Sequence, residues 1–157
     1  MNYTLYKNSP VGDLIIYGKE GYLYGLEYFK QNFIKESWKE DKKEFKDTID
    51  QLNLYFEGEL KEFEIDLKIE TSPFSKRVYE ELQKIPYGTT ISYEELAKRV
   101  GNPKASRAVG NANGKNPLAI IVPCHRVIAK NGKIGGYSGG MDKKRKLLKL
   151  EGIYLNG

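Results

Sequence analysis

The chain has 157 residues, of which 39% are hydrophobic, with one cysteine, one histidine and a net charge of +5. This composition supports a core and excludes a disordered chain, and a single cysteine excludes an internal disulfide framework. The two side chains also cannot complete a structural zinc site, which takes about four N or S ligands, and no apolar run approaches the roughly 18 residues of a membrane span. Because the first residues lack a signal-peptide pattern, we expect a cytoplasmic protein in a reducing compartment.

Charge divides the chain into two unlike halves. Residues 1–70 carry 10 Lys and no Arg against 15 acidic residues, a net charge of −5, whereas residues 71–157 carry 16 basic against 6 acidic residues, a net charge of +10. A basic half of this kind favours contact with a polyanion, above all a nucleic acid. Basic faces that are merely solvated are also common, so charge alone leaves both interpretations open.

The first 70 residues predict a small antiparallel sheet with one helix. β-prone runs within residues 3–29 are broken by the turn sequences NSPVGD and GKEG, and the polar segment 32–45 predicts an exposed connection. The alternation EFEIDL at residues 62–67 predicts one more strand. Between these segments, apolar residues at helical spacing predict a helix that Gly58 ends; they are Phe45, Ile49, Leu52 and Phe56.

From residue 71 the pattern becomes helical. Ser72 is a predicted N-cap with Pro73 at the first helical position, and Ser92 with Glu95 forms a capping box that begins a second helix. The buried positions of these two helices are predicted to be Phe74, Val78, Leu82, Ile85, Leu96, Ala97 and Val100. The sequence MDKKRKLLKLEG predicts the last helix.

A third helix is expected directly after Gly101. Asn102 is the predicted cap and Pro103 the first helical residue, so that two short helices joined by a glycine-containing turn form a helix-turn-helix. Small side chains dominate residues 103–112, and Lys104 and Arg107 are expected to share one face. Such a helix suits close approach to DNA, with the cations at phosphates or entering the base stack. The alternative is tight packing on the neighbouring helix with Arg107 merely solvated.

The cysteine and the histidine are adjacent, at Cys124 and His125. A thiol is a good nucleophile only when ionised, and a neighbouring imidazole can accept its proton directly or through a water. In a regular strand the two side chains would point to opposite faces, but Pro123 breaks that regularity and allows a turn toward one cavity. A buried, inert cysteine beside a histidine by coincidence is the alternative that the dipeptide alone leaves open.

The longer motif is more specific. PCHRVI, preceded by NP and followed by GGYSGG, resembles the O6-alkylguanine-DNA alkyltransferases, also called methylated-DNA–protein-cysteine methyltransferases. The resemblance covers about the last 85 residues, through ISYEELA, GNPKASRAVG, NPLAIIVPCHRVI, GYSGG and LEG in order, and SPVGDLII extends it more loosely into the first half. It implies an α+β protein in which a small N-terminal α/β domain of a short antiparallel sheet and a helix, residues 1–70, precedes a mainly helical, winged-helix-like domain with a helix-turn-helix, residues 71–157.

The resemblance implies a role for each matching catalytic residue. Cys124 would accept the alkyl group, His125 would act as its base through a bound water, and Glu151 would orient His125. Tyr93 would sit at the flipped nucleotide and donate to guanine N3.

The resemblance also implies a set of binding residues. Arg107 would fill the space left by the flipped base, Ser138 would donate to guanine O6, Tyr137 would wall the pocket, and Asn116 would brace the cysteine loop. The main-chain carbonyls of Cys124 and Val127 would accept from the guanine amine. The remaining residues predicted to contact DNA or substrate are Lys104, Ala105, Ser106 and Gly139. Asn113 stands where some relatives carry Met, which we expect to tune the fit without removing function.

The implied activity is repair of double-stranded DNA carrying O6-alkylguanine, with O4-methylthymine as a second potential substrate, by one irreversible transfer to Cys124. A single cysteine cannot release the resulting thioether, so each molecule is expected to act once, as a monomer, with no metal, cofactor or membrane involved. Two other classes remain open: a DNA-binding module whose cysteine is inert, and a cysteine hydrolase that turns over repeatedly.

Overall fold

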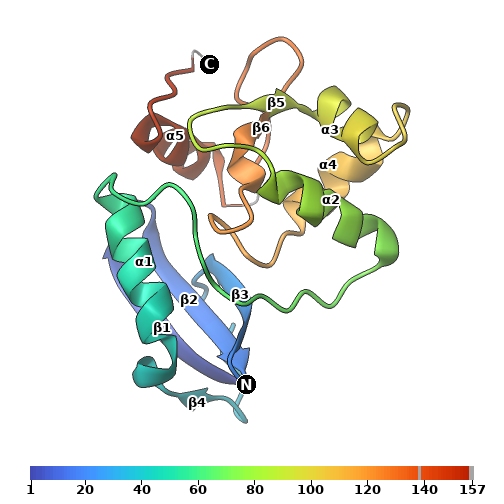
Figure 1. Ribbon diagram of the computed structural model, residues 1–157. Coiled ribbons are helices and arrows are strands. Elements are labelled where there is room, and N and C mark those ends of the chain that lie inside the picture. Colours follow the sequence, from blue (N-terminus) through green and yellow to red (C-terminus); the bar gives the residue numbers. More distant parts are fainter. Residues whose placement is uncertain (138, 156–157) are drawn as a thin grey trace. The chain divides into compact units, whose positions relative to one another are not determined.

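The computed structural model describes residues 1–137 and 139–155. Within it the chain forms two compact units, Met1–Ile69 and Glu70–Gly157, which run from blue to green and from green to red in Figure 1. In the part of the chain that the structure describes, no helix is long and apolar enough to cross a membrane.

The first unit contains the predicted antiparallel sheet. Strands β1 (Asn2–Ser9), β2 (Gly12–Lys19) and β3 (Tyr22–Tyr28) form two hairpins, and β4 (Lys39–Glu40) adds a short parallel edge beside β1. The second hairpin turns through Glu20 and Gly21, both at positive φ, which is the conformation of a two-residue turn whose twist matches its strands. The predicted strands and turns of residues 3–29 are therefore confirmed.

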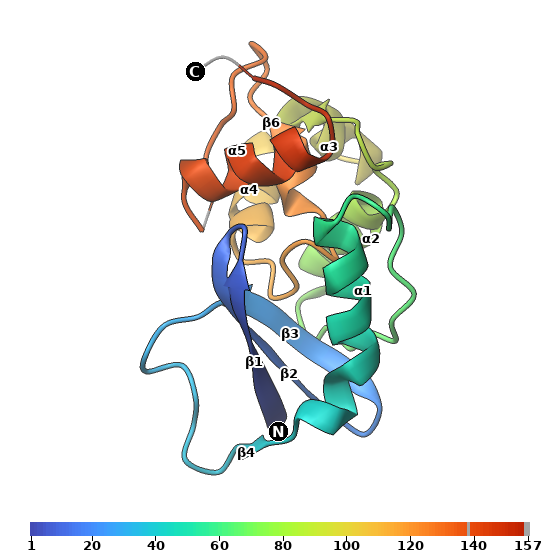
Figure 2. The same cartoon turned by 90° about the vertical axis from the view of Figure 1, so that its left-hand side faces the viewer.

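A helix lies against this sheet (Figure 2). After the 3-10 turn η1 (Lys42–Phe45), helix α1 spans Lys46–Phe56, and Tyr6 of β1 donates a hydrogen bond to Asn53 of α1. The predicted helix is confirmed, but its buried stripe is partly wrong. The structure buries Phe45, Thr48, Leu52 and Tyr55, whereas Ile49 and Phe56 are half-exposed, because the ring of Tyr55 turns inward to pack against that of Phe63.

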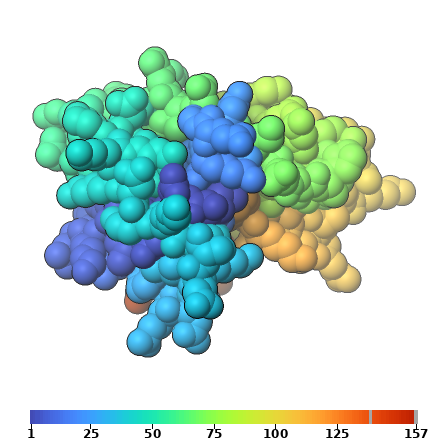
Figure 3. Space-filling view, turned by 90° about the horizontal axis from the view of Figure 1, so that it is seen from below, coloured from blue at the N-terminus to red at the C-terminus, as the bar shows by residue number. Residues whose placement is uncertain are grey.

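The polar connection before α1 is less exposed than predicted. Figure 3 shows this segment, in light blue, at the surface, but Phe33 and Trp38 are half-buried, with their ring centroids 5.6 and 5.0 Å from that of Tyr17. The connection also contains β4 and η1. Two aromatic side chains in a polar segment thus anchor it to the sheet.

The predicted strand at residues 62–67 does not form. Only a single bridge joins Leu67 to Leu23 of β3. The physical reason is a competing partner, because the side chain of Gln51 in α1 donates to the carbonyl of Glu64 at 3.0 Å and accepts its amide at 2.8 Å. These bonds satisfy the backbone that a strand would have paired.

The second unit is mainly helical, as predicted. Helix α2 spans Pro73–Gln83, α3 spans Tyr93–Arg99, α4 spans Ser106–Gly114 and α5 spans Met141–Leu150. The two predicted caps are confirmed: Ser72 Oγ accepts the Ser75 amide at 3.2 Å, and Ser92 Oγ accepts the Glu95 amide at 3.0 Å. A two-stranded parallel sheet of β5 (Ile91–Ser92) and β6 (Val127–Ile128) lies beside α3 (Figure 1).

The α3–α4 pair forms the predicted helix-turn-helix, but α4 begins later than expected. Asn102 does not cap it; its Oδ1 accepts the Lys104 amide at 3.2 Å and its carbonyl accepts the Ala105 amide at 3.0 Å. These bonds close a turn, so Lys104 precedes the helix. The predicted helical face shared by Lys104 and Arg107 is therefore wrong.

Candidate active site around Cys124

The loop that leads to Cys124 is held by one asparagine. Asn116 donates from Nδ2 to the Val122 carbonyl at 2.7 Å and accepts the Leu118 amide on Oδ1 at 2.9 Å. Within this loop Ile120 has φ +73°, a conformation that β-branched residues rarely adopt, so the surrounding bonds hold a strained backbone. The loop delivers Cys124 to the start of the 3-10 turn η2 (Cys124–Arg126), where 2% of the residue is exposed.

The small parallel sheet brings Tyr93 to the same place. Strand β6 follows η2 directly, and its Val127 pairs with Ile91 of β5. Because β5 ends where α3 begins, Tyr93 is the first helical residue beside the segment that follows Cys124. Its hydroxyl donates to the Gly136 carbonyl at 3.3 Å, which places it next to the glycine-rich segment.

A buried carboxylate accepts hydrogen bonds from several donors beside the cysteine. Glu151 at the end of α5 lies 2.7 Å from Nε2 of His125, and it accepts from Nε and Nη2 of Arg126 at 2.8 and 3.1 Å. The Gly88 amide donates to it at 3.2 Å, and Arg126 also donates to the Ile85 carbonyl at 2.8 Å. The charged groups of this cluster are thus paired inside the unit, as buried charges must be.

The pKa shifts assign a protonation state to this cluster. Burial alone would raise the pKa of Glu151, but the hydrogen bonds from His125 and Arg126 and the charge of Arg126 outweigh it and hold that pKa well below its usual range. Burial lowers the pKa of His125, and the hydrogen bond and charge of Glu151 offset this only in part. The imidazole is therefore neutral near pH 7, with Nε2 donating to the carboxylate. Its Nδ1 has no hydrogen-bond partner among the residues that the structure describes, so its lone pair is available as a base.

Two opposing effects act on the pKa of the Cys124 thiol. Burial raises the pKa of Cys124, while hydrogen bonds from Asn116 and Tyr137 and the charge of Lys144 act in the opposite direction. The side chain of Lys144 is fully buried, and its Nζ donates to the carbonyls of Val127 and Gly136 at 2.7 and 3.0 Å. Burial lowers the pKa of Lys144 to about 8, so most of this ammonium is still charged at pH 7. It supplies a fixed positive charge that favours the thiolate.

A pocket opens next to these groups. It has a cavity volume of about 150 Å³ and is lined by Tyr93, Gly110, Asn113, Gly114, Gly136 and Tyr137. Tyr137 belongs both to this lining and to the surroundings of the Cys124 thiol. The pocket therefore has aromatic and glycine walls between which a flat group can lie.

The outer face of α4 is small and cationic. Arg107, Ala108 and Asn111 are exposed, whereas Val109 and Ala112 are buried on the inner face. Tyr79 of α2 fixes this inner face by donating to the Ala112 carbonyl at 2.9 Å. The exposed face can approach another molecule closely, with Arg107 projecting from it.

The predicted site residues fall into two groups in the structure. The cluster and its pocket bring together Cys124, His125, Glu151, Tyr93, Asn116, Val127 and Tyr137. Lys104 and Arg107 are exposed and Ser106 is half-buried at or just before α4, while Ala105 is buried at the N-cap position. Gly139 is half-buried, and Ser138 lies outside the described residues.

Sequence reasoning missed three buried polar residues of the site. Because charged side chains are usually exposed, the sequence alone gives no reason to place Arg126 and Lys144 in the site, and it marks Asn113 only as a residue that tunes the fit. A signal for Lys144 was present, since it stands three and four residues before Leu147 and Leu148 and so shares their buried helical face. No comparable periodicity marks Arg126.

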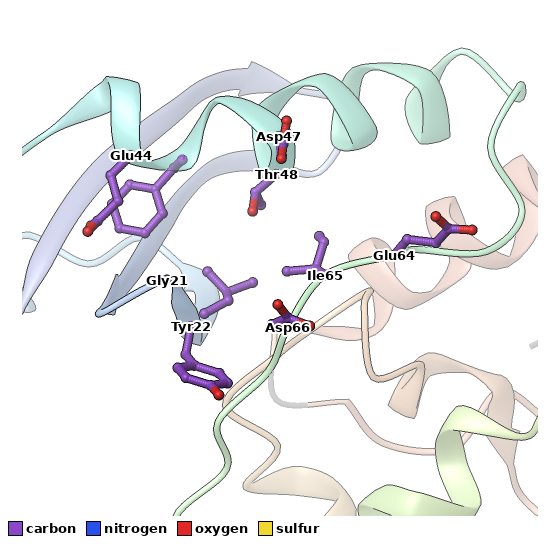
Figure 4. A pocket seen from close by; sticks show the side chains of 10 residues that line it. Gly21, Tyr22, Glu44, Asp47, Thr48, Glu64, Ile65 and Asp66 are labelled. Atoms are coloured by element: carbon purple, nitrogen blue, oxygen red, sulfur yellow. The ribbon is translucent and has the colours of Figure 1, made fainter.

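A second pocket lies in the first unit and has a different character. It has a cavity volume of about 190 Å³, and Thr48 of α1 and Ile65 of the following segment lie on opposite sides of it (Figure 4). Its other polar lining consists mostly of carboxylates, from Glu44, Asp47, Glu64 and Asp66. It lacks the cysteine and histidine, so it offers no comparable nucleophile. Across the described residues, no group of three or more His, Cys, Asp or Glu side chains is arranged to hold a metal ion.

The fold and the site together define a helix-turn-helix protein with a buried cysteine–histidine–glutamate cluster. The chain belongs to the 6-O-methylguanine DNA methyltransferase family. The model of that family's DNA-binding domain matches residues 73–153, and the model of its ribonuclease-like domain matches residues 1–69.

Similar proteins that match nearly the whole chain support this assignment. A methylated-DNA–protein-cysteine methyltransferase of Methanosarcina acetivorans is 49% identical, over 97% of this chain and 99% of the relative. Its namesake from Mycolicibacterium paratuberculosis is 48% identical, over 92% of this chain and 88% of the relative. The protein in the crystal structure of Mycobacterium tuberculosis OGT in complex with DNA is 47% identical in sequence to this chain. The two structures superpose with a TM-score of 0.90, over 96% of this chain and 92% of the other.

Proposed function

We propose that this protein is a methylated-DNA–protein-cysteine methyltransferase that repairs O6-alkylguanine in double-stranded DNA by moving the alkyl group to Cys124. The observation that carries the proposal is the hydrogen bond of 2.7 Å between neutral His125 and Glu151 directly beside a buried thiol. A hydrogen-bonded base next to a cysteine is the arrangement that nucleophilic catalysis by a thiol requires. Family membership supplies the substrate class.

The proposed reaction begins with transfer of the thiol proton. His125 takes it on Nδ1 through a water, and Glu151 stabilises the imidazolium through Nε2. The thiolate then attacks the alkyl carbon, so that a carbon–sulfur bond forms while the bond from that carbon to guanine O6 breaks. The electron pair of the broken bond leaves with guanine, which is stabilised by hydrogen-bond donors and takes up a proton.

Tyr93 is the proposed donor to the leaving base. In the structure its hydroxyl makes a hydrogen bond of 3.3 Å to the Gly136 carbonyl, at the wall of the pocket. A bond of this length is weak, so the hydroxyl can exchange it for guanine N3 when a base enters. Charge that develops on the base is then met by a donor already in place.

The proposed role of α4 is to hold duplex DNA with the base extruded. Extrusion costs a few kcal/mol of stacking, and a side chain inserted into the duplex offsets part of this cost. Arg107 is exposed on the small outer face of α4, from which it can enter the stack, and Lys104 is exposed just before the helix, where it can contact a phosphate.

The product sets the stoichiometry. A thioether has no easy leaving group, and the chain has no second cysteine to displace it, so each molecule is proposed to act once. Each molecule is proposed to act as a monomer. Because the thiol must stay reduced, a reducing compartment such as the cytoplasm is the proposed location.

A titration with excess substrate tests the proposal against its alternatives. The protein is mixed with a molar excess of duplex DNA containing one O6-methylguanine, and the methyl groups transferred are counted by intact-protein mass spectrometry over time. We expect one methyl group per protein and then no further reaction. Binding without any adduct would indicate a DNA-binding module, and repeated turnover on an ester or peptide would indicate a hydrolase.

A further inference from the structure

The acidic pocket of the first unit, the one shown in Figure 4, contains a buried hydroxyl. Thr48 of α1 lines this pocket and is 5% exposed, and its hydroxyl forms no hydrogen bond with a residue that the structure describes. Figure 4 shows the Thr48 oxygen pointing away from α1 and into the space in front of Ile65 and Asp66. Because a buried hydroxyl without a partner is unfavourable, a ligand that hydrogen-bonds to Thr48 gains stability here.

Four carboxylates line the same pocket. They come from η1 and α1, which carry Glu44 and Asp47, and from the segment after α1, which carries Glu64 and Asp66. Among the described residues none of the four forms a salt bridge, and Lys46, next to Asp47, is paired instead with Asp50 at 2.8 Å. The described lining includes no lysine or arginine, so the pocket attracts cations.

Hydrogen bonds hold the two walls of the acidic pocket in place. The Gln51 side chain of α1 pairs with the backbone of Glu64 at 3.0 and 2.8 Å. The Leu23 amide of β3 donates to the Asp66 carbonyl at 2.8 Å, and the Leu23 carbonyl accepts the Lys68 amide at 2.9 Å. The segment that carries the two acids is therefore fixed to both the helix and the sheet, and the site is formed before a ligand arrives.

The shape of the pocket favours an extended organic cation over a metal ion. Across the described residues, no group of three or more acidic side chains is arranged to hold a metal. The cavity of about 190 Å³ is several times the roughly 30 Å³ that one water occupies, so a chain of several atoms fits. Leu23, Phe45 and Ile65 offer apolar surface to methylene groups. At the rim, the Tyr22 ring already accepts a cation, because the Lys68 ammonium lies 5.5 Å from its centroid.

We propose that the acidic pocket binds a linear aliphatic diamine or polyamine. One ammonium group donates to the Thr48 hydroxyl, the methylene chain lies on the apolar surface, and a second ammonium group is bound by pocket carboxylates that include Glu64. The residues involved all belong to the first unit. The inference therefore stands independently of the proposed function of Cys124.

Isothermal titration calorimetry on the full chain tests this proposal with 1,4-diaminobutane as the probe, at low ionic strength, where surface charges are least screened. We expect saturable binding of one diamine per chain. The n-butylammonium ion, which has the chain but only one charge, should bind at least about tenfold more weakly. Magnesium ion, which carries the same charge as the diamine without the chain, should show no saturable binding.

Variants of the pocket identify the groups that bind the diamine. Thr48→Val removes the hydroxyl at nearly constant volume and should weaken diamine binding about tenfold, whereas Thr48→Ser keeps a hydroxyl and should bind as tightly as the wild type. Glu64→Gln removes one exposed charge and should weaken binding about threefold. The matched control is Glu36→Gln, an exposed glutamate outside the pocket, which should leave the affinity unchanged.

Several results would overturn the proposal. Absence of saturable diamine binding, or binding of magnesium as tight as that of the diamine, would show only a screened acidic surface. Equally tight binding of n-butylammonium would mean that the pocket holds a single ammonium group, such as a lysine side chain of another protein. Undiminished affinity in Thr48→Val would exclude the hydroxyl. If Thr48→Val shows no cooperative thermal transition by circular dichroism, the comparison of Glu64→Gln with Glu36→Gln decides, because equal affinities would place the diamine elsewhere.

Discussion

The two units of this chain bury different kinds of side chain. In Met1–Ile69 the buried polar residues are two threonines, Thr4 and Thr48, and the other buried side chains are hydrophobic. In Glu70–Gly157 the buried set includes four ionisable or charged side chains in addition to Cys124. They are His125, Arg126, Lys144 and Glu151. Both units carry many charged residues, but only the second places them in its interior.

The interior of the first unit serves mainly stability, whereas the interior of the second unit also holds groups suited to chemistry. Buried charges contribute little net stability even when well paired, and they strongly destabilise a protein when one partner is lost. The cluster around Cys124 therefore needs a reason other than folding, and a proton path for a buried thiol provides one. The first unit, with an apolar interior, follows the ordinary rules of a stable core.

The largest expected effect is that of removing the nucleophile. We expect Cys124→Ala to abolish methyl transfer from O6-methylguanine DNA while lesion binding is retained, because the pocket and the α4 face stay in place. Intact-protein mass spectrometry and fluorescence anisotropy with labelled duplex measure the two properties. If binding disappeared together with transfer, Cys124 would be a structural residue. A proton path to the thiol would then no longer explain the buried charges of the second unit.

Removing the charge of Glu151 affects both chemistry and folding. We expect Glu151→Gln to slow transfer about 10²- to 10⁴-fold, since His125 loses the partner that sets its orientation. Unfolding free energy should fall by about 3 kcal/mol, because Arg126 becomes an unpaired buried charge. Single-turnover kinetics and urea denaturation check this, with exposed Glu62→Gln as control. Full activity in Glu151→Gln would show that the carboxylate is only structural.

A core substitution in the first unit should give the opposite pattern. Leu52 is fully buried in α1, and Leu52→Ala is expected to lower unfolding free energy by about 2–5 kcal/mol through lost burial and a cavity. Under conditions where the variant is folded, its transfer rate should match that of the wild type. A loss of transfer as large as that of Glu151→Gln would show that the two units are not separable in this way.

Arg107→Ala should separate DNA handling from chemistry. Because Arg107 is exposed, its loss should change stability by no more than about 0.5 kcal/mol. We expect transfer from duplex DNA to slow by at least tenfold, while transfer from the free base O6-benzylguanine stays unchanged. Equal losses on both substrates would argue against insertion into the duplex.

The smallest expected effect is a pH dependence of stability that comes from the second unit. His125 is buried with a lowered pKa, so below its ordinary pKa of about 6.5 the unfolded chain binds a proton that the folded protein excludes. Stability should therefore fall as the pH drops from about 6.5 to 5, by up to about 1.4 kcal/mol per pH unit for one proton. Glu151, with its depressed pKa, loses its contribution only at still lower pH, below about 4.3. Urea denaturation across this range, compared with His125→Asn, checks the slope; an identical slope in the variant would exclude His125 as its source.

Local signals explain which parts of the fold were predictable. Ser72 and Ser92 cap helices through their own side chains, and the Glu20–Gly21 turn needs only two residues, so short sequence patterns suffice. The start of α4 was mispredicted because Asn102 bonds within a turn, where its side chain is equally well satisfied. The strand at 62–67 was mispredicted because its partner, Gln51, lies on another element.

In the site, too, features set by neighbouring residues are predictable from the sequence, whereas features set by distant elements are not. The motif around Cys124 indicates the proposed nucleophile, the proposed base and an aromatic pocket residue through its resemblance to a family, and the structure places these groups in one unit. The burial of Arg126 and Lys144 is hard to predict from the sequence, because it depends on which elements pack over them and not on their neighbours in sequence.

Peptide mapping after reaction with alkylated DNA shows whether the buried thiol of the second unit receives the alkyl group. The protein is incubated with duplex DNA containing O6-methylguanine and digested with trypsin, which releases residues 116–126 as one peptide. We expect one added methyl group on this peptide, located at Cys124 by fragmentation. A methyl group on another residue, or an unmodified peptide after the DNA has been bound, would contradict it.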